Sequence, residues 1–343
     1  MPEPRGERGE SNVIVGAGPI GLACAISAKR RGLDSLVIDA GALANSIVRY
    51  PIGMTFFTTP ERLEIGGHPL VSSGAKATRE EALKYYRGVA RAEGIRVRTY
   101  AKLVSAHQVE TRLGGGREPI EWERLVLATG YFDHPNRLGV PGEELPHVHH
   151  YFDEAHLSYG LDVVVIGGKN SAVEAALQLF RAGARTTIVY RGAAWPQSVK
   201  YWLRPDLENR IQAGEIAARM SSNVVEITAR DVRIRGGRGG PQGDERIPAD
   251  RVYPLIGFHP DLALFKQLGI AFDAESGRPE IDPDTLETSV PGVHVAGSVT
   301  GGNRISEVFI ENGRFDGEKI FGSPAERARA KDLYQGIRRE TGE

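Results

Sequence analysis

The sequence predicts an α/β protein with two parallel-sheet domains, the second inserted in the first. A short apolar strand, a glycine-rich turn and a helix follow one another twice, about 150 residues apart. At 343 residues the chain is long enough for two domains, each with its own core. A repeated unit of this kind is typical of two Rossmann-like, three-layer (ββα/βαβ) dinucleotide-binding domains.

Composition narrows the class of protein. Apolar residues make up 41% of the chain and charged residues 25%, which is ordinary for a globular protein. The net charge of −1 gives no general attraction to nucleic acid or to an acidic membrane. No apolar run reaches the length of a membrane-spanning helix, so we expect none. Residues 1–10 are charged and lack the apolar stretch of a signal peptide, so we expect a disordered lead and a cytoplasmic protein.

The first unit begins with a strand at 12–15, followed by Gly16-Ala17-Gly18-Pro19-Ile20-Gly21 and a helix at 20–31. Gly16 allows the tight turn, Gly18 lets backbone amides approach a pyrophosphate, and Gly21 lets helix and strand pack closely. The helix N-terminus adds amide donors and the positive end of its dipole. Incidental glycines in a plain strand–turn–helix are the alternative, which this full context disfavours.

A second strand at 35–38 ends in Asp39, 23 residues after Gly16. A carboxylate at this place accepts hydrogen bonds from ribose hydroxyls, and it suits the unphosphorylated ribose of FAD. The long segment 40–75 is rich in Gly, Pro and Thr, and we expect a functional or ligand-ordered loop there. An amphipathic helix is predicted at 80–93. Strands are predicted at 95–100, 104–110 and 125–128, with a hairpin turn at 114–116, and the proline-bearing segment 129–150 is predicted to connect the domains.

The second unit has a strand at 163–166, the loop Gly167-Gly168-Lys169-Asn170-Ser171-Ala172, a helix at 171–182 and a strand at 186–190. Lys169 replaces the middle glycine and could meet a phosphate as a point charge. The second strand ends in Tyr190-Arg191 without an acid, and an arginine there favours the 2′-phosphate of NADPH over NADH. A solvated surface arginine is the alternative for Arg191. Lys200 and Arg204 could join this basic patch.

The remaining elements complete the predicted domains. We expect strands at 224–228, 232–235, 251–255 and 293–295, a surface turn at 236–243, and a helix near 305–321. The predicted FAD-binding domain comprises residues 11–134 and 257–322, and the NADPH-binding domain comprises residues 135–256. Residues 1–10 and 323–343 are predicted to be flexible or helical tails. The connectors 131–141 and 255–260 are candidate hinges between the domains.

Several segments carry a resemblance to one family. They read LEIG at 63–66, ATGYFDHPN at 128–136, VPGE at 140–143, VVIGGKNS at 164–171, YRG at 190–192 and IENGRF at 310–315. With them, roughly residues 12–322 resemble the bacillithiol disulfide reductase (YpdA-like) family, within the low-molecular-weight thioredoxin-reductase-like flavoproteins. The resemblance implies bound FAD, NADPH as electron donor and a homodimer.

The loops and the resemblance together give the candidate cofactor-binding residues. Those for FAD are Gly16, Gly18, Pro19, Gly21, Asp39, Ala40, Asn45, Ser46, Thr129, Gly130, Gly297 and Ser298. Those for NADPH are Gly167, Gly168, Lys169, Asn170, Ser171 and Arg191. No catalytic residue is assigned. No metal site is expected either, because no acid or cysteine completes a ligand set around His147, His149 and His150.

The chain departs from the family pattern in its first loop. The family usually reads Gly-Pro-Cys-Gly there, and its cysteine has been proposed as redox-active, whereas this chain has Ile20. A second departure, from the broader class, is Ala296-Gly297-Ser298 in place of Ala-Gly-Asp, since a serine hydrogen-bonds a ribityl hydroxyl more weakly than a carboxylate does. The single cysteine, Cys24, excludes an internal dithiol and is expected to fill space as a small core residue.

The predicted function is that of an FAD-dependent NADPH oxidoreductase. Its expected acceptor is a disulfide such as a low-molecular-weight thiol disulfide, reduced without an internal CxxC pair. A quinone, a ferredoxin-like protein or oxygen are alternative acceptors. A low-turnover redox sensor that binds both nucleotides is a further alternative, and a flavin monooxygenase is less favoured because its fingerprint is not found in this chain.

Overall fold

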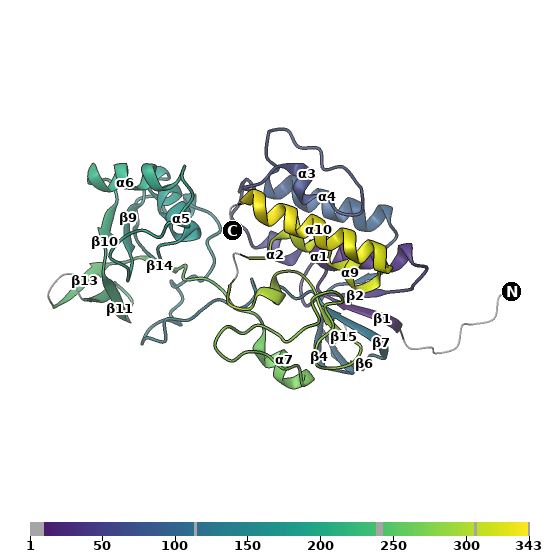
Figure 1. Cartoon of the computed structure of the whole chain (residues 1–343). Helices are drawn as coiled ribbons and strands as arrows, with labels where there is room; N and C mark the ends of the chain where they lie inside the picture. Colours follow the sequence, from purple (N-terminus) through teal and green to yellow (C-terminus); the bar gives the residue numbers. More distant parts are fainter. Residues whose placement is uncertain (1–9, 113–114, 238–242, 305–306, 342–343) are drawn as a thin grey trace. The chain divides into compact units, whose positions relative to one another are not determined.

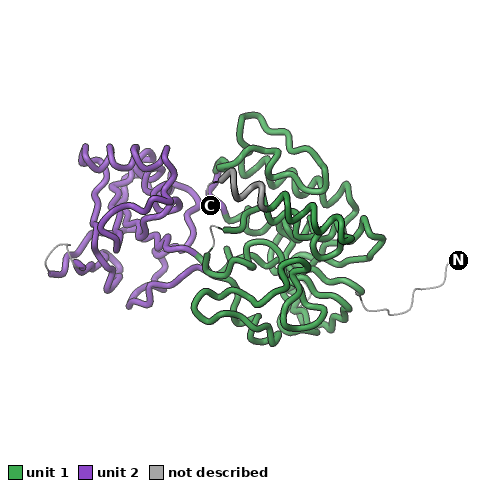
Figure 2. The backbone as a smooth tube through the Cα atoms, in the orientation of Figure 1, with its two compact units in different colours: residues 1–49, 53–134, 258–343 green, residues 50–52, 135–257 purple. Residues whose placement is uncertain are grey.

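The computed structural model describes residues 10–112, 115–237, 243–304 and 307–341. The chain forms two compact units, which are coloured separately in Figure 2. Unit 1 comprises residues 1–49, 53–134 and 258–343, and unit 2 comprises residues 50–52 and 135–257. Unit 2 therefore interrupts the sequence of unit 1, as the predicted insertion requires.

Unit 1 is built on a parallel five-stranded sheet in the order β15-β7-β1-β2-β3. Its strands are β1 (Glu10–Val15), β2 (Leu36–Ile38), β3 (Val97–Arg98), β7 (Trp122–Leu127) and β15 (Val293–Val295). Successive residues of a strand point to opposite faces, so each face of this sheet has a core of its own. On one face, Ile14 and Val126 pack with apolar residues of the helices α1 (Pro19–Arg30) and α9 (Asp316–Phe321).

The other face of this sheet packs on a small antiparallel sheet and a helix. Val13 and Leu125 lie in a core with Leu103, Val109 and Phe265. The antiparallel strands are β4 (Ala101–Ser105), β5 (Gln108–Thr111) and β6 (Gly116–Pro119), and the helix is α7 (Leu262–Leu268). Figure 1 shows the long helices of unit 1 on the side of the parallel sheet opposite to these strands.

The predicted single strand at 104–110 is wrong. A two-residue turn at 106–107 reverses the chain, so the segment is shared between β4 and β5. Leu103 and Val109 are then cross-strand partners that are both buried, which satisfies the same alternating pattern with two short strands. Of the predicted hairpin turn at 114–116, Gly114 lies outside the described residues, and β5 pairs with β6 across it.

The helices of unit 1 differ in detail from the predicted ones. The predicted loop 40–75 contains two short helices, α2 (Asn45–Val48) and α3 (Pro60–Leu63). The predicted amphipathic helix is α4 (Arg79–Ala92), which begins with a capping box between Thr78 and Glu81. The predicted helix near 305–321 is two helices, α8 (Ile310–Gly313) and α9, preceded by the 3₁₀ helix η2 (Gly297–Gly301), and residues 305–306 lie outside the described ones. The last helix, α10 (Pro324–Thr341), packs on α8 and α9.

Unit 2 repeats the parallel-sheet plan at a smaller size. Its sheet has the order β10-β9-β8-β14, with all pairs parallel. The elements are η1 (His156–Ser158), β8 (Asp162–Ile166), α5 (Asn170–Arg181), β9 (Arg185–Val189), α6 (Arg204–Gln212), β10 (Ala217–Arg219) and β14 (Arg251–Pro254). One core joins the sheet to α5 and α6, through Val163, Val173 and Leu207 among others. A second core joins the sheet to a three-stranded antiparallel sheet.

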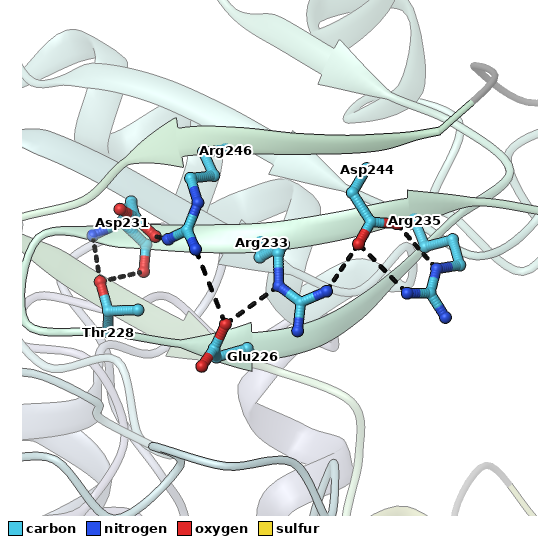
Figure 3. Close-up of polar contacts among 7 residues, drawn as sticks. All are labelled: Glu226, Thr228, Asp231, Arg233, Arg235, Asp244 and Arg246. Atoms are coloured by element: carbon cyan, nitrogen blue, oxygen red, sulfur yellow. Dashed lines mark hydrogen bonds and ion pairs between the residues drawn. The ribbon is translucent and has the colours of Figure 1, made fainter.

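That antiparallel sheet consists of β11 (Ser222–Ile227), β12 (Asp231–Gly236) and β13 (Asp244–Pro248). Arg233 and Arg246 lie directly opposite each other on β12 and β13, which would be unfavourable for two like charges alone. Acids on the same sheet compensate, since Arg233 lies 2.9 Å from Glu226 and 2.6 Å from Asp244, and Arg246 lies 2.7 Å from Asp231 (Figure 3).

Asp244 also pairs with Arg235 at 2.7 Å. The two arginines lower the pKa of Asp244 to about 2, chiefly through the bond with Arg235 and then through that with Arg233. No strand was predicted at β13, because Ile247 is its one buried residue and its other side chains are polar or exposed.

Among the described residues, no helix is long and apolar enough to cross a membrane.

Two candidate nucleotide-binding loops

The first loop has backbone geometry that only glycine can provide at Gly16 and Gly21. Gly16 has φ +110°, and a Cβ there would lie 2.3 Å from the carbonyl oxygen of Ala128. A Cβ on Gly21 would lie 1.8 Å from the carbonyl oxygen of Gly16. At Gly18, by contrast, a Cβ would meet nothing within 4 Å. The backbone at Gly18 therefore borders open space at the start of α1, where Pro19 is the first helical residue.

Asp39 ties the first loop to the end of β2. Its carboxylate accepts hydrogen bonds from the backbone amides of Ala17 and Gly41, each at 2.7 Å. Burial raises the pKa of Asp39, while these two amides act in the opposite direction. Each carboxylate oxygen can accept more than one hydrogen bond, so ribose hydroxyls can still bind Asp39. Ala40 lies between Asp39 and Gly41 in the sequence, in the bend that follows β2.

Asn45 and Ser46 lie in the first turn of α2, directly after that turn. The Asn45 side chain accepts a hydrogen bond from the Ala42 amide at 3.3 Å and donates one to Asp133 at 3.5 Å. Asp133 also pairs with Arg49 at 3.2 Å. The structure thus joins the segment after β2 to the segment after β7 beside the first loop.

The segments after β7 and β15 meet beside the same loop. A Cβ on Gly130 would lie 3.7 Å from Ser298 Oγ, so two predicted FAD residues are neighbours. The hydroxyl of Thr129 is buried and has no hydrogen-bond partner in the described part of the chain. Buried hydroxyls are normally paired, so this orphaned group fits a site that a ligand completes. Open space at Gly18, the Asp39 carboxylate and the Thr129 hydroxyl together fit a bound dinucleotide such as FAD.

Ile20 has a packing role in this arrangement. A Cβ on Gly297 would lie 2.9 Å from Ile20 Cγ1, and a Cβ on Gly313 would lie 3.1 Å from Ile20 Cδ1. The side chain that replaces the family's cysteine therefore lies against the backbone of η2 and α8. Gly297 itself has φ +76°, and its amide donates to Asp316 Oδ2 at 2.8 Å.

Cys24 is inaccessible to a substrate. Its side chain is 0% exposed in the core between α1 and the sheet. Burial raises the pKa of its thiol far above the usual range, and the charge of Asp316 adds to the shift. Because the thiolate is the reactive form of cysteine, Cys24 is inert, as the expected core role requires.

The second loop repeats the geometry of the first with different side chains. Gly167 has φ +140°, and a Cβ there would lie 2.4 Å from the carbonyl oxygen of Leu255. Lys169 is the N-cap residue of α5, and its side chain is exposed. Ser171 and Arg191 are also exposed, at the start of α5 and just after β9. Exposed cations beside a helix N-terminus are suited to bind phosphate groups.

Asn170 has a role that the sequence did not suggest. Its side-chain amide donates to the carbonyl of Ser198 at 3.0 Å and accepts from the amide of Lys200 at 2.8 Å. The residue therefore holds the segment 198–200 next to the start of α5. The side chains of Lys169, Ser171 and Arg191 are open to solvent, whereas Gly167 and Gly168 are buried and the ring of Tyr190 covers Gly168.

His147, His149 and His150 lie between the two loops in the sequence. His150 lies 2.6 Å from Arg137 and 3.8 Å from Glu143, and burial lowers the pKa of its ring. Glu143 instead accepts the backbone amides of Leu138 and Gly139, each at 2.8 Å. No group of three or more His, Cys, Asp or Glu side chains within the described ranges is placed to hold a metal ion.

The chain is similar to known proteins along most of its length. The profile of a family described as pyridine nucleotide-disulphide oxidoreductase matches residues 13–297. Bacilliredoxin reductase Bdr of Bacillus subtilis (strain 168) is 41% identical over 321 residues, which cover 93% of this chain and 98% of the relative. The solved structure of bacillithiol disulfide reductase Bdr (YpdA) from Bacillus cereus matches with a TM-score of 0.87 and 39% identity, over 94% of this chain and 100% of that chain. The corresponding Staphylococcus aureus structure has a TM-score of 0.83 and 35% identity, over 95% and 98%.

These likenesses confirm the predicted fold class and the family that the sequence resembles. They also confirm that the protein is an enzyme, an oxidoreductase that depends on FAD and a pyridine nucleotide. The assignment of individual residues to the two cofactors stays a prediction. The chain belongs to the pyridine nucleotide-disulphide oxidoreductase family, within which it groups with the bacillithiol disulfide reductases.

Proposed function

We propose that this enzyme transfers electrons from NADPH, by way of FAD, to a low-molecular-weight thiol disulfide, and that bacillithiol disulfide is such an acceptor. One observation carries the proposal: two loops of matching backbone geometry differ in the residues at the ends of their second strands. Asp39 suits the unphosphorylated ribose of FAD, whereas Tyr190-Arg191 suits the 2′-phosphate of NADPH. The names of the relatives above supply the class of acceptor.

The chemistry belongs to the cofactors: with both bound, NADPH and one proton reduce the disulfide to two thiols, and the flavin relays the two electrons. In unit 1, the open backbone at Gly18 and the N-terminus of α1 would hold the FAD pyrophosphate. Asp39 would bind its ribose, while Thr129 and Ser298 would offer hydroxyls to the ribityl chain and flavin. The remaining predicted residues, Pro19, Gly130 and Gly297, would shape this site through their backbone.

In unit 2, Lys169 and Arg191 would bind the phosphates of NADPH. Both side chains are exposed, and Lys169 is the N-cap residue of α5, whose N-terminal amides can serve as donors to a phosphate. Asn170 would act indirectly, because its side chain holds the segment 198–200. No thiol of this chain can form a mixed disulfide with the acceptor, since Cys24 is buried and Ile20 carries no sulfur.

We further propose a homodimer and a cytoplasmic location. The homodimer follows from the family resemblance, and sizing of the purified holoenzyme by light scattering tests it. The cytoplasm fits a disulfide reductase because cytosolic thiols are kept reduced by such enzymes.

An acceptor panel under anaerobic conditions tests the function. Purified holoenzyme is mixed with NADPH and either bacillithiol disulfide, glutathione disulfide, a soluble quinone or a ferredoxin, and NADPH absorbance is followed. The proposal requires turnover with bacillithiol disulfide and the release of two thiols per NADPH. Turnover with the quinone or ferredoxin but not with either disulfide overturns it, and so does flavin reduction by NADPH with no turnover on any acceptor.

A further inference from the structure

Tyr190 in unit 2 occupies the place that Asp39 occupies in unit 1. The amide of Gly16 donates to the Ile38 carbonyl at 2.7 Å, and the amide of Gly167 donates to the Val189 carbonyl at 2.9 Å. Asp39 follows Ile38, and Tyr190 follows Val189. The amides of both residues continue the sheet in the same way, Asp39 to Arg98 at 3.0 Å and Tyr190 to Arg219 at 2.9 Å.

The side chains of Asp39 and Tyr190 make different contacts with their glycine-rich loops. The Asp39 carboxylate accepts the amide of Ala17, the second residue of the first loop. The Tyr190 ring instead lies against Gly168, the second residue of the second loop, where a Cβ would come within 2.4 Å of a ring carbon. The chain thus has a carboxylate that accepts hydrogen bonds after β2, and an aromatic ring, that of Tyr190, at the equivalent place after β9.

Three neighbours hold the Tyr190 ring in this position. A Cβ on Gly192 would also come within 2.4 Å of the ring, so a larger residue at Gly168 or Gly192 would displace the ring. The indole of Trp195 stacks on the ring, with centroids 5.6 Å apart and planes inclined by 13°. Trp195 itself packs against the main core of unit 2. The Tyr190 ring is therefore packed between Gly168, Gly192 and Trp195.

The residues around Tyr190 favour a 2′-phosphate over the two hydroxyls of an unphosphorylated ribose. Ribose hydroxyls need an acceptor such as a carboxylate, and residues 190–205 contain no Asp or Glu. Arg191 is the next residue and is exposed, and Lys169 is exposed at the start of α5. A 2′-phosphate at this place would gain donors from cations without repulsion from an acid.

We propose that Tyr190, clamped by Trp195 and two glycines, is a specificity-determining residue that restricts unit 2 to 2′-phosphorylated pyridine nucleotides. The inference deepens the proposed use of NADPH and rests on it. It assigns the discrimination between NADPH and NADH to Tyr190, which occupies the position of the acid in an NADH site, in addition to Arg191, which attracts the phosphate.

The test measures nucleotide binding and not turnover. Calorimetry compares adenosine 2′,5′-bisphosphate with AMP, which lacks only the 2′-phosphate, on the FAD-loaded protein. For Tyr190→Asp, which copies Asp39 into unit 2, the preference for the bisphosphate is expected to fall by at least about tenfold. Tyr190→Phe keeps the ring and should stay within about threefold of the wild type. A wild-type preference in Tyr190→Asp, or an equal loss in Tyr190→Phe, overturns the proposal.

A second variant keeps the test decisive if Tyr190→Asp does not fold. Trp195→Leu removes the stacking partner and leaves Tyr190 in place, so the preference is expected to fall by about threefold or more. Trp202→Leu, a change of an exposed aromatic residue in the same segment, is the matched control and should bind as the wild type does. Equal preference in both tryptophan variants overturns the clamp. A wild type that binds both nucleotides equally contradicts the NADPH proposal itself, which separates the two failures.

Discussion

The amide of Gly297 donates a 2.8 Å hydrogen bond to Oδ2 of Asp316, a carboxylate that is 2% exposed. Asp316 begins α9, so a buried acid holds the turn in which Ser298 lies. Lys319 approaches the other carboxylate oxygen at 3.4 Å. Desolvation raises the pKa of Asp316, while Lys319 and the Gly297 amide counteract it. The pair of Gly297 and Asp316 therefore connects the stability of the core to the predicted FAD site.

Removal of this carboxylate should destabilise unit 1 and weaken FAD retention. Asp316→Ala leaves the buried Gly297 amide without an acceptor, at a cost of about 1–3 kcal/mol. It also leaves Lys319 buried without its acid. Asp316→Asn keeps an acceptor oxygen and should retain more FAD than Asp316→Ala. The flavin-to-protein absorbance ratio after gel filtration and the thermal midpoint are the measurements.

Asp284 offers a matched control, because it pairs with Lys331 on the surface with 61% of its side chain exposed. Asp284→Ala should change stability by less than about 0.5 kcal/mol. If Asp316→Ala retains FAD and unfolds as Asp284→Ala does, the Gly297–Asp316 contact has no role in the site.

The raised pKa of Asp316 predicts a pH dependence of stability. A carboxyl whose pKa is higher in the folded than in the unfolded chain holds its proton more tightly when folded. Folding therefore loses stability as pH rises from the unfolded pKa of about 4 through the folded value. Asp316→Asn lacks this titration, so the stability of the wild type relative to this variant should decrease as pH rises from about 4. Thermal midpoints of both proteins across that range measure the difference, and a constant difference would contradict the raised pKa.

The two glycines of the first loop should respond differently to alanine. Gly16→Ala forces a side chain into φ +110° and to within 2.3 Å of a backbone oxygen, so it should prevent stable folding of unit 1. Gly18 has φ −76° and open space, so Gly18→Ala should fold normally. Its methyl group would instead obstruct the approach of a pyrophosphate and lower FAD affinity. Circular dichroism and FAD titration of the apoprotein distinguish the two effects, and full FAD affinity in Gly18→Ala would argue against a pyrophosphate at that amide.

The features that could be predicted from the sequence are those whose physical cause lies within a few neighbouring residues. Gly16, Gly21 and Gly167 follow from the turn after a central strand, and the structure shows backbone clashes that exclude other residues at these positions. Asp316 was not predicted to support the loop, because its partner lies 19 residues away and the contact exists only after α9 packs on the sheet.

The same reasoning accounts for the other differences. β13 was missed because cross-strand ion pairs such as Arg235–Asp244 stabilise it, and a strand with one buried residue has no apolar alternation. The position of Asn170 at the cofactor stays a prediction, whereas the match of its amide to the backbone of residues 198 and 200 is one that no spacing in the sequence reveals.

Replacement of Cys24 should leave catalysis unchanged. Cys24→Ala removes a buried sulfur from the core, so a loss of about 1 kcal/mol in stability is expected. The rate of disulfide reduction should stay within about twofold of the wild type, because the protonated thiol takes no part in the reaction. Alkylation by iodoacetamide, followed by mass spectrometry, should modify Cys24 only in denaturant. Modification of the native enzyme with loss of activity would show that the thiol is accessible.

Ile20→Cys places a thiol where the family's cysteine stands and tests whether that position can take part in electron transfer. The Ile20 side chain lies against the backbone of Gly297 and Gly313, so we expect a cysteine there to pack against these two residues. We expect kcat/KM for the disulfide acceptor to change by less than about threefold, with a stability loss of about 1 kcal/mol from the smaller side chain. Ile20→Val is the matched control for the change in volume. A rise of tenfold or more in disulfide reduction by Ile20→Cys, absent from Ile20→Val, would show that a thiol at this position reaches the acceptor, and would mean that this chain reduces disulfides by a weaker route than its relatives.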